Sequence, residues 1–330
     1  MSRVLVTGCA GMIGSHVCDR LLENSHEVYG VDDLSGGVRE NVPKAVRFFK
    51  DDIGDAFAMR HAFSVAQPDF VIHGAAFAAE NLSHNTRVFT IENNLAGEAV
   101  IRNLSIEFDV KCMVSLSSIA VMGHQEPPFH DDTTPSPRDP YGICKFAGEL
   151  DARAAREFHG LNYCVVRPHN VIGTRQNYSD RYRNVAAIFV RQALEGKPLT
   201  IFGTGEQTRA FSPVSYVSEI IAKTIDRPAC WNQPFNVGCE DVITVKDLAN
   251  LVILTSGANT YPQYLEARKE ASHAHMTHGI CAELFKEVVC RDSIVTALQG
   301  MIDEARTKGF RPMQKGPRIE VAKGLPDSWK

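Results

Sequence analysis

The sequence predicts an α/β protein in which a doubly wound parallel sheet is followed by a smaller mixed α/β domain. A short apolar strand, a glycine-rich loop and a helical pattern follow one another at the N-terminus. Four of the first five predicted strands are joined through helical patterns, which is typical of a parallel sheet with helices on both faces. The chain of 330 residues is longer than one hydrophobic core usually supports, so we expect two domains.

Composition and charge exclude several classes of protein. The net charge is −4, so the overall charge does not favour nucleic acid or an anionic membrane as a partner. No apolar run reaches the roughly 18 residues of a membrane span, and no signal-peptide pattern opens the chain. The nine cysteines are scattered without a Cys-x-x-Cys pair, which is typical of reduced thiols. We therefore expect a cytoplasmic protein.

The N-terminal unit has the spacing of a phosphate-binding loop. Residues 3–6 form the first predicted strand, and Gly8, Gly11 and Gly14 follow in a loop that opens into a helix. The first glycine permits a tight turn, the second lets the backbone approach a pyrophosphate, and the third lets helix pack on strand. The helix start at Met12-Ile13 offers free N–H groups and a positive dipole end to phosphates. The alternative is a glycine-rich βα turn that binds nothing.

The second predicted strand, residues 27–31, ends at Asp32 and Asp33. An acid about 20 residues after the glycine loop accepts hydrogen bonds from an adenosine ribose. Its charge repels a 2′-phosphate, and no arginine follows immediately to hold one. NAD is therefore favoured over NADP as the cofactor, and we place Ser35 and Gly36 of the next turn in the same site.

The third and fourth predicted strands end at further candidate cofactor residues. Residues 46–49 form the third strand, and Asp52 and Ile53 follow it in a position that suits adenine. Residues 69–73 form the fourth strand, after which the small side chains of Ala75-Ala76 let a ligand lie close. Since parallel strands present their carboxyl ends at one edge of the sheet, these residues are expected to meet the glycine loop.

The fifth predicted strand, residues 111–116, opens into Ser117-Ser118. A long helix over about residues 87–108 precedes it and carries Asn94. Ser118 therefore belongs to the same ligand edge of the sheet.

Tyr141 and Lys145 lie four residues apart in a predicted helix that runs to about residue 158. Positions i and i+4 share one helix face, so the ammonium stands beside the phenol. A neighbouring ammonium favours the phenolate and lowers the tyrosine's pKa from about 10. Such a tyrosine can exchange a proton with a hydroxyl near neutral pH. The pair alone is a weak signal, because the spacing also occurs in ordinary exposed helices.

The βα rhythm becomes irregular after the sixth predicted strand, residues 163–166. We expect a dinucleotide-binding domain over residues 1–168, with a returning segment near 211–237, and a discontinuous substrate-binding domain over 169–330. Further predicted elements are a helix to about residue 194, a strand over 197–202, a helix from Thr244 to Leu254 and a last helix near 294–306.

Together these residues resemble the extended short-chain dehydrogenase/reductase superfamily, with its Rossmann domain, and in particular NAD-dependent nucleotide-sugar epimerases and dehydratases such as UDP-glucose 4-epimerase. The resemblance covers nearly the whole chain. Its markers are Thr7-Gly8-x-x-Gly11-x-x-Gly14, Asp32, Asp52-Ile53, His73-x-Ala75-Ala76, Asn94, Ser117-Ser118, Tyr141-x-x-x-Lys145, Arg167-Pro168-His169-Asn170 and Gly203-Thr204-Gly205-x-Gln207-Thr208-Arg209.

The resemblance implies roles at the matching positions. Tyr141 is the acid and base, Lys145 holds the nicotinamide ribose, and Ser118 hydrogen-bonds the reacting hydroxyl. Asn94 and His169 join the cofactor site. The implied substrate-binding residues, which grip the diphosphate and face the uracil, are Asn170, Asn184, Val185, Thr200, Phe202, Arg209 and Arg268. Asn184 has the alternative of a helix cap, and each arginine that of a surface position.

The residues that follow Ser118 distinguish between the reactions that the related enzymes catalyse. Related 4,6-dehydratases carry an Asp-Glu pair after this serine, and decarboxylating relatives carry a glutamate, whereas Ile119-Ala120 follows Ser118. The resemblance therefore implies epimerisation at C4 of a UDP-hexose (glucose, galactose, N-acetyl or uronic acid form). The alternatives are a dehydratase or reductase of the same fold and a catalytically silent NAD-binding protein.

Two further expectations concern metals and assembly. His273, His275 and His278 are spaced like metal ligands, but no nearby acid or cysteine completes a set, so we expect no metal site. The resemblance implies a homodimer through a helix bundle that includes the helices of Asn94 and Tyr141.

Overall fold

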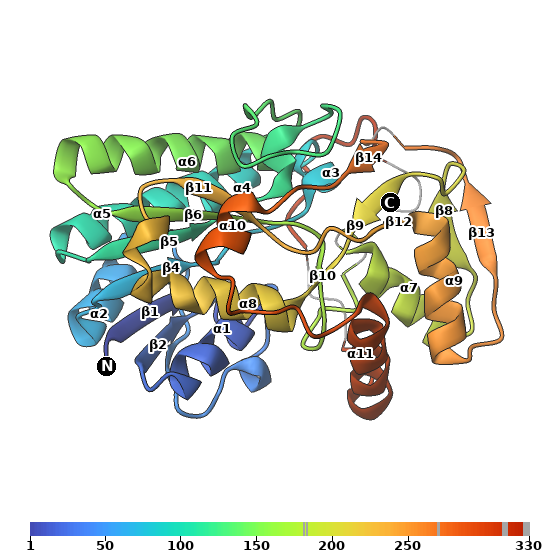
Figure 1. The fold of residues 1–330 in the computed structure, drawn as a ribbon, viewed down its shortest axis with the longest axis horizontal. Coiled ribbons are helices and arrows are strands. Elements are labelled where there is room, and N and C mark those ends of the chain that lie inside the picture. The colour runs from blue at the N-terminus through green and yellow to red at the C-terminus, as the bar shows by residue number, and fades with distance from the viewer. Residues whose placement is uncertain (181, 183, 269–270, 312–315, 326–330) are drawn as a thin grey trace.

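The computed structural model describes the chain over residues 1–330 except 181, 183, 269–270, 312–315 and 326–330. A large sheet with helices on both faces forms one half of the molecule, and a smaller group of helices and short strands lies beside it (Figure 1).

Within the described residues, seven parallel strands form the central sheet, in the order β11-β6-β5-β4-β1-β2-β3. Their bounds are β1 (Arg3–Thr7), β2 (Glu27–Val31), β3 (Arg47–Phe49), β4 (Phe70–His73), β5 (Cys112–Leu116), β6 (Tyr163–Pro168) and β11 (Pro234–Val237). The strand order reverses between β1 and β4, and ligands bind in doubly wound sheets at such a point. The predicted doubly wound α/β fold is confirmed.

Helices cover both faces of this sheet (Figure 1). On one face lie α1 (Met12–Glu23), α8 (Val214–Lys223) and α10 (Gly279–Leu284); on the other lie α2 (Ala56–Ala66), α4 (Arg87–Ile91), α5 (Gly97–Glu107) and α6 (Pro140–His159). The apolar sides of these helices are buried against the apolar strands of the sheet. Leu21 and Ile220 lie on the first face, and Phe63 and Ile101 lie on the second.

The long helix expected over residues 87–108 is interrupted. A π-helical turn, η2 (Glu92–Ala96), separates α4 from α5 and contains Asn94. The Asn94 amide bonds both backbone groups of Phe77, with Phe77 N to Oδ1 at 2.7 Å and Nδ2 to Phe77 O at 3.1 Å. The widened turn places this side chain at the loop after β4, and π-turns inside helices often mark such functional positions.

The smaller half has its own apolar core, to which Phe189, Leu248 and Ile302 belong. Its main elements are α7 (Val185–Leu194), β8 (Leu199–Phe202), β9 (Thr208–Ala210), β12 (Val242–Thr244), α9 (Val245–Ser256), β13 (Pro262–Leu265), β14 (His273–Ala274) and α11 (Ile294–Lys308). The remaining short elements are η1 (Arg39–Asn41), α3 (Glu80–Ser83), η3 (Ile119–Met122), β7 (Val171–Ile172), β10 (Ser212–Pro213), η4 (Thr224–Asp226) and η5 (Pro228–Cys230). In the part of the chain that the structure describes, no helix combines the length and apolar character needed to span a membrane.

Candidate active site

A cleft of about 450 Å³ runs across the carboxyl ends of the central strands and reaches α7 of the smaller half. Its volume is typical of ligand pockets. Most of the residues predicted from the sequence line it, namely Gly8, Gly11, Met12, Ile13, Gly14, Asp32, Asp33, Ser35, Gly36, Asp52, Ile53, Ala75, Ala76, Ser118, Tyr141, Lys145, Asn170, Asn184 and Val185.

The glycine loop has the geometry that suits a dinucleotide. Gly8 has a left-handed φ of +74°, and a Cβ there would lie 2.7 Å from the backbone nitrogen of Ala75. A Cβ on Gly14 would collide with the carbonyl oxygen of Gly8. Among the described residues, no side chain caps the N-terminus of α1, which starts at Met12. The free N–H groups of its first turn therefore face the cleft, where they fit the pyrophosphate of NAD.

Asp32 holds this loop in place while its carboxylate lines the cleft. Its Oδ2 accepts a 2.9 Å hydrogen bond from the backbone of Ala10, and its Oδ1 accepts one of 2.8 Å from Leu34. Burial raises the pKa of Asp32, and these hydrogen bonds oppose the rise. The exposed Asp33 accepts hydrogen bonds from the backbone and hydroxyl of Ser35. The acidic edge fits a ribose with free hydroxyls.

The residues at the start of helix α6 fix where the helix begins and thereby place Tyr141 at the cleft. The Asp139 carboxylate caps the helix by accepting a 2.9 Å hydrogen bond from Gly142 N, and Pro140 occupies the first helical position. A Cβ on Gly142 would lie 2.6 Å from the carbonyl oxygen of Ala120. Glycine there lets the start of α6 approach η3, and Ser118 is the cap of η3, with its Oγ accepting a 3.2 Å hydrogen bond from Ala120 N.

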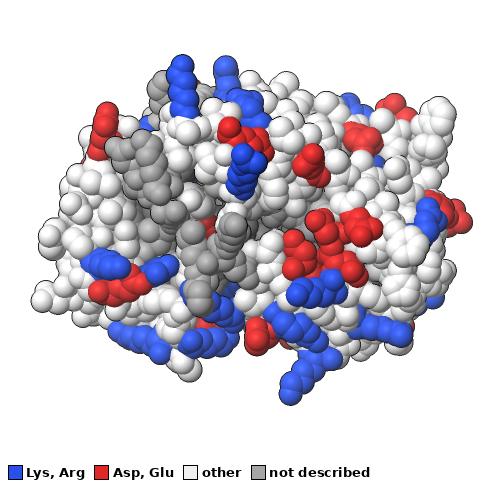
Figure 2. Space-filling model, turned by 180° about the vertical axis from the view of Figure 1, so that it is seen from behind, with Lys and Arg blue, Asp and Glu red and all other residues white. Residues whose placement is uncertain are grey.

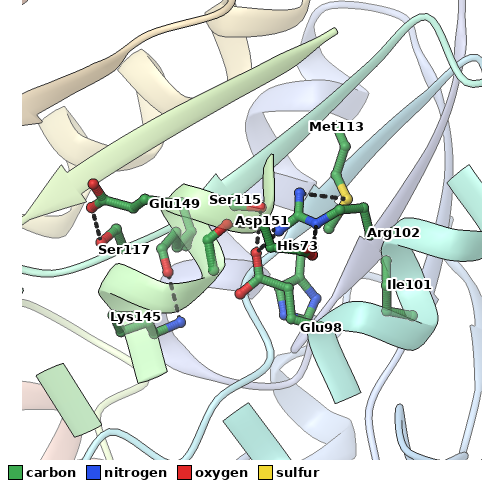
Figure 3. Close-up of polar contacts among 12 residues, drawn as sticks. His73, Glu98, Ile101, Arg102, Met113, Ser115, Ser117, Lys145, Glu149 and Asp151 are labelled. Atoms are coloured by element: carbon green, nitrogen blue, oxygen red, sulfur yellow. Dashed lines mark hydrogen bonds and ion pairs between the residues drawn. The ribbon is translucent and has the colours of Figure 1, made fainter. Parts of the chain in front are cut away.

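Lys145 is buried one helical turn after Tyr141. Its amino group donates a 2.7 Å hydrogen bond to the carbonyl oxygen of Leu116 at the end of β5 (Figure 3). Burial lowers the pKa of Lys145, and the Glu98 carboxylate is the largest opposing influence. The lysine is therefore fixed between the strand that leads to Ser118 and the helix that carries Tyr141.

A buried ion pair supports the same strand end. Glu149 of α6 accepts hydrogen bonds from Arg167 Nε at 2.9 Å and Nη2 at 2.6 Å, and from the Ser117 hydroxyl at 2.5 Å. The Ser117 contact is drawn in Figure 3. Because Ser117 precedes Ser118, this pair fixes the backbone that carries the cleft serine.

Other predicted site residues do not line the cleft. Asn94 reaches the site indirectly, since it fixes Phe77 in the loop of Ala75-Ala76. His169 is buried, with Nδ1 3.2 Å from Ala210 O and Nε2 3.0 Å from the Nε2 of His278. Burial, reinforced by His278, lowers the pKa of His169 to about 3.

The predicted diphosphate and uracil residues divide into two groups. Asn184 lines the cleft and also caps α7, because its Oδ1 accepts a 2.9 Å hydrogen bond from Ala186 N. Arg209, which does not line the cleft, donates to the carbonyls of Thr208, Ala271 and Ser272. Arg268 stacks 3.2 Å over the ring of Phe202, and Thr200 bonds the side chain of Gln192; these also lie outside the cleft lining.

The histidine run has other partners. His273 Nδ1 lies 2.8 Å from the hydroxyl of Thr208, and His278 faces both His169 and Glu240. Among the described residues, no three histidine, cysteine or acidic side chains are grouped as a metal site requires.

On the face shown in Figure 2, the described basic and acidic side chains are intermixed.

Sequence reasoning missed Glu98 and Arg102. They look like an ordinary exposed i,i+4 pair on a helix, but both are buried, at 3% and 2% exposure, beneath Lys145. The sequence carries no signal for this burial, because it follows from the approach of α6 at Gly148.

Comparisons with known proteins identify the family of the chain. The model of the NAD dependent epimerase/dehydratase family matches residues 4–238. A UDP-glucose 4-epimerase from Mycolicibacterium smegmatis is 32% identical over 79% of this chain and 85% of its own length. A solved UDP-glucose 4-epimerase with UDP-glucose from Thermotoga maritima has a TM-score of 0.88 and 31% identity, covering 92% of this chain and 99% of its own. One from Thermus thermophilus in complex with NAD has a TM-score of 0.85 and 29% identity, with the same coverage. The chain therefore belongs to the NAD-dependent epimerase/dehydratase family, and its cofactor is NAD.

Proposed function

We propose that the protein epimerises a UDP-hexose at C4 through a 4-keto intermediate. The observation that carries this proposal is the meeting of Ser118, Tyr141 and Lys145 at one cleft, with Ile119-Ala120 and no acid after Ser118. Oxidising an alcohol needs a base at its O–H and a hydride acceptor at its C–H. Elimination of water needs an additional acid and base, and the position after Ser118 does not supply them.

Each of these three residues has a defined role in the proposed reaction. Tyr141 accepts the proton of the 4-hydroxyl and later returns it to the same oxygen, after the keto sugar has turned its other face toward the hydride. Lys145 supplies the positive charge that stabilises the Tyr141 phenolate. Ser118 donates its hydroxyl hydrogen to the reacting oxygen, since its Oγ already accepts a hydrogen bond from Ala120 N. Bound NAD would supply the acceptor, and in its reduced form the donor, of the C4 hydride.

The substrate lies between the two halves of the molecule in this proposal. Asn170, Asn184 and Val185 line the cleft on the side of the smaller half, where the diphosphate is placed. The N-terminus of α7 starts at Val185 and points a positive dipole end at the phosphates. The guanidinium group of Arg268, stacked on Phe202, is assigned to the uridine end, and Arg209 supports it through the backbone of residues 271–272.

A dehydratase or reductase of the same fold is the second candidate, and a silent NAD-binding protein the third. The lining of the cleft by both Tyr141 and Lys145 speaks against the silent protein, because binding alone does not need that pair. A 4-keto product that accumulates, or net consumption of NADH, would favour the second candidate.

A homodimer belongs to the same proposal. Val88 and Ile91 of α4 and Ile143 of α6 are exposed apolar side chains, at 58%, 48% and 51%, on helices that pack side by side. Such a patch is typical of a subunit interface. Light scattering tests it: a dimer is expected, and Ile143→Glu is expected to give monomers.

The cytoplasm is the proposed location, supported by cysteines that are all free in the described residues.

The decisive experiment for the activity is direct. Purified protein is incubated separately with UDP-glucose, UDP-galactose and their N-acetyl and uronic acid forms, and the products are read by NMR. Inversion at C4 of at least one sugar without net change in NAD is expected. No inversion of any of them would refute the epimerase proposal, and loss of water from the sugar would replace it with the dehydratase.

A further inference from the structure

A cluster of buried charges lies to one side of Lys145 and links β5, α5 and α6 (Figure 3). Glu98 of α5 accepts a hydrogen bond from Arg102 Nη2 and another, 2.9 Å long, from the hydroxyl of Ser115. Arg102 also donates from Nε to Asp151 of α6 at 2.7 Å. Among the described residues of this cluster, only Asp151 is substantially exposed, with 49% of its side chain accessible to solvent.

The Glu98 carboxylate is pressed against α6. A Cβ on Gly148 would lie 2.7 Å from Glu98 Oε2, and Arg102 Nη2 donates a 3.1 Å hydrogen bond to the Gly148 carbonyl. The bonds from Arg102 and Ser115 both end on Oε1, so Oε2 is the oxygen on the α6 side. Gly148 is three residues from Lys145, so Glu98 packs on the face of α6 that carries the lysine. The two side chains also bond adjacent residues of β5, Glu98 at Ser115 and Lys145 at Leu116.

The charged and titratable groups around the Lys145 amino group come from three elements of the described chain. They are His73 of β4, Glu98 and Arg102 of α5, and Tyr141, Cys144 and Glu149 of α6. Buried ammonium groups need a negative partner, because burial alone favours the neutral amine.

Most of these groups cannot provide the negative charge. Burial lowers the pKa of His73 to about 4, which leaves it neutral, and burial raises the pKa of the Cys144 thiol. Both oxygens of Glu149 are held by Arg167. Burial alone raises the pKa of Glu98, but its neighbours, Arg102 first among them, outweigh burial and lower that pKa, so Glu98 is ionised. Of the acidic groups, Glu98 therefore opposes the effect of burial on Lys145 most strongly.

We propose that Glu98 is a positioning residue that holds Lys145 in its ammonium form against the Leu116 carbonyl, with Arg102 moderating the negative charge that the lysine experiences. The consequence for turnover, which rests on the proposed function, is that Glu98 sets the upper pH at which Tyr141 has a cationic neighbour. Removing Glu98 leaves Arg102 with Asp151 as its acidic partner and lowers the pKa of Lys145 further. Removing Arg102 strengthens the field of Glu98 and raises that pKa.

The test measures the lysine itself and needs no substrate. Protein labelled with ¹³C at lysine Cε is titrated by NMR, and the Lys145 signal is assigned by its absence in Lys145→Met. The midpoint is expected to fall by about one pH unit or more in Glu98→Gln and to rise in Arg102→Gln, where one unit is a tenfold change in ionisation. It is expected to stay in place in Asp151→Asn, the matched control at the exposed edge of the same cluster.

Opposite shifts distinguish an electrostatic role from damage to the fold, which would not move one midpoint down and the other up. Midpoints that stay in place, or that move together, would overturn the proposal. If either single variant does not fold, Glu98→Gln with Arg102→Gln removes both buried charges, and its midpoint must still lie below that of the parent. Failure of every sugar to invert would refute the epimerase proposal alone, since the NMR titration stands without turnover. Where inversion occurs, the alkaline limb of its pH profile is expected to follow the NMR midpoint.

Discussion

The amino group of Lys145 donates a 2.7 Å hydrogen bond to the backbone carbonyl of Leu116, the last residue of β5. This bond joins the two elements that carry the chemistry, because Ser118 follows Leu116 by two residues and Tyr141 precedes Lys145 by one helical turn. The side chains of the predicted catalytic trio are therefore set by one strand end and one helix start.

Replacing Tyr141 by Phe removes the proposed base while it keeps the ring that is 8% exposed at the cleft. General acid–base catalysis typically contributes about 10²- to 10⁴-fold, so we expect C4 inversion to fall by at least that factor. The NAD content of the purified protein, measured by chromatography after denaturation, is expected to be unchanged. Turnover equal to that of the parent would refute the role of Tyr141.

The buried pair of Glu149 and Arg167 is expected to matter strongly for stability. Glu149→Gln leaves the Arg167 guanidinium without its charged partner, and breaking a buried pair costs about 3–5 kcal/mol. Unfolding in urea measures this loss. The control is Glu107→Gln, which breaks the exposed pair with Arg60 and is expected to leave the unfolding midpoint in place. Equal effects of the two variants would contradict the prediction.

The sheet and the glycine loop could be predicted because their signals are local. Each strand is a short apolar run whose bounds depend on its own residues, and β2 begins and ends at the predicted residues 27–31. The same holds for the cap of α9, where Thr244 accepts a 2.9 Å hydrogen bond from Asp247 N.

The support of the site could not be predicted, because it depends on contacts between distant segments. His169 was expected at the cofactor, but its ring is held by His278, which lies 109 residues further along the chain. The i,i+4 spacing of Glu98 and Arg102 does not reveal burial, since burial follows from the approach of α6 at Gly148. Glycines such as Gly142 have no periodic pattern that shows which backbone they must approach.

Stability is expected to fall in acid because two histidines are buried in neutral form. The pKa of His73 is lowered to about 4 and that of His169 to about 3, from an ordinary value of 6.5. Between pH 6.5 and these values the unfolded chain takes up protons that the folded chain does not, so stability falls as pH falls. Each histidine contributes about 1.4 kcal/mol per pH unit in that range. Urea unfolding at pH 6.5, 5.5 and 4.5 measures the slope, which is expected to become shallower in His169→Gln; an identical slope would contradict the assignment.

Gly148→Ala tests the close approach of α5 and α6. Helix propensity alone favours alanine over glycine by about 1 kcal/mol inside a helix. The added Cβ, however, would lie 2.7 Å from Glu98 Oε2, and that carboxylate is held by Arg102 and Ser115. Because this carboxylate cannot move without giving up these bonds, we expect a net loss of about 1–3 kcal/mol in urea unfolding.

Gly300→Ala in α11 is the matched control for this substitution. Its Cβ would lie 3.5 Å from Thr174 Cγ2, an ordinary contact, so the helix propensity of alanine is expected to stabilise the protein by up to about 1 kcal/mol. The two substitutions are chemically identical and both helical, so a difference in sign isolates the packing of Glu98 against α6. If Gly148→Ala is as stable as Gly300→Ala, the carboxylate is free to move and does not hold the two helices in register.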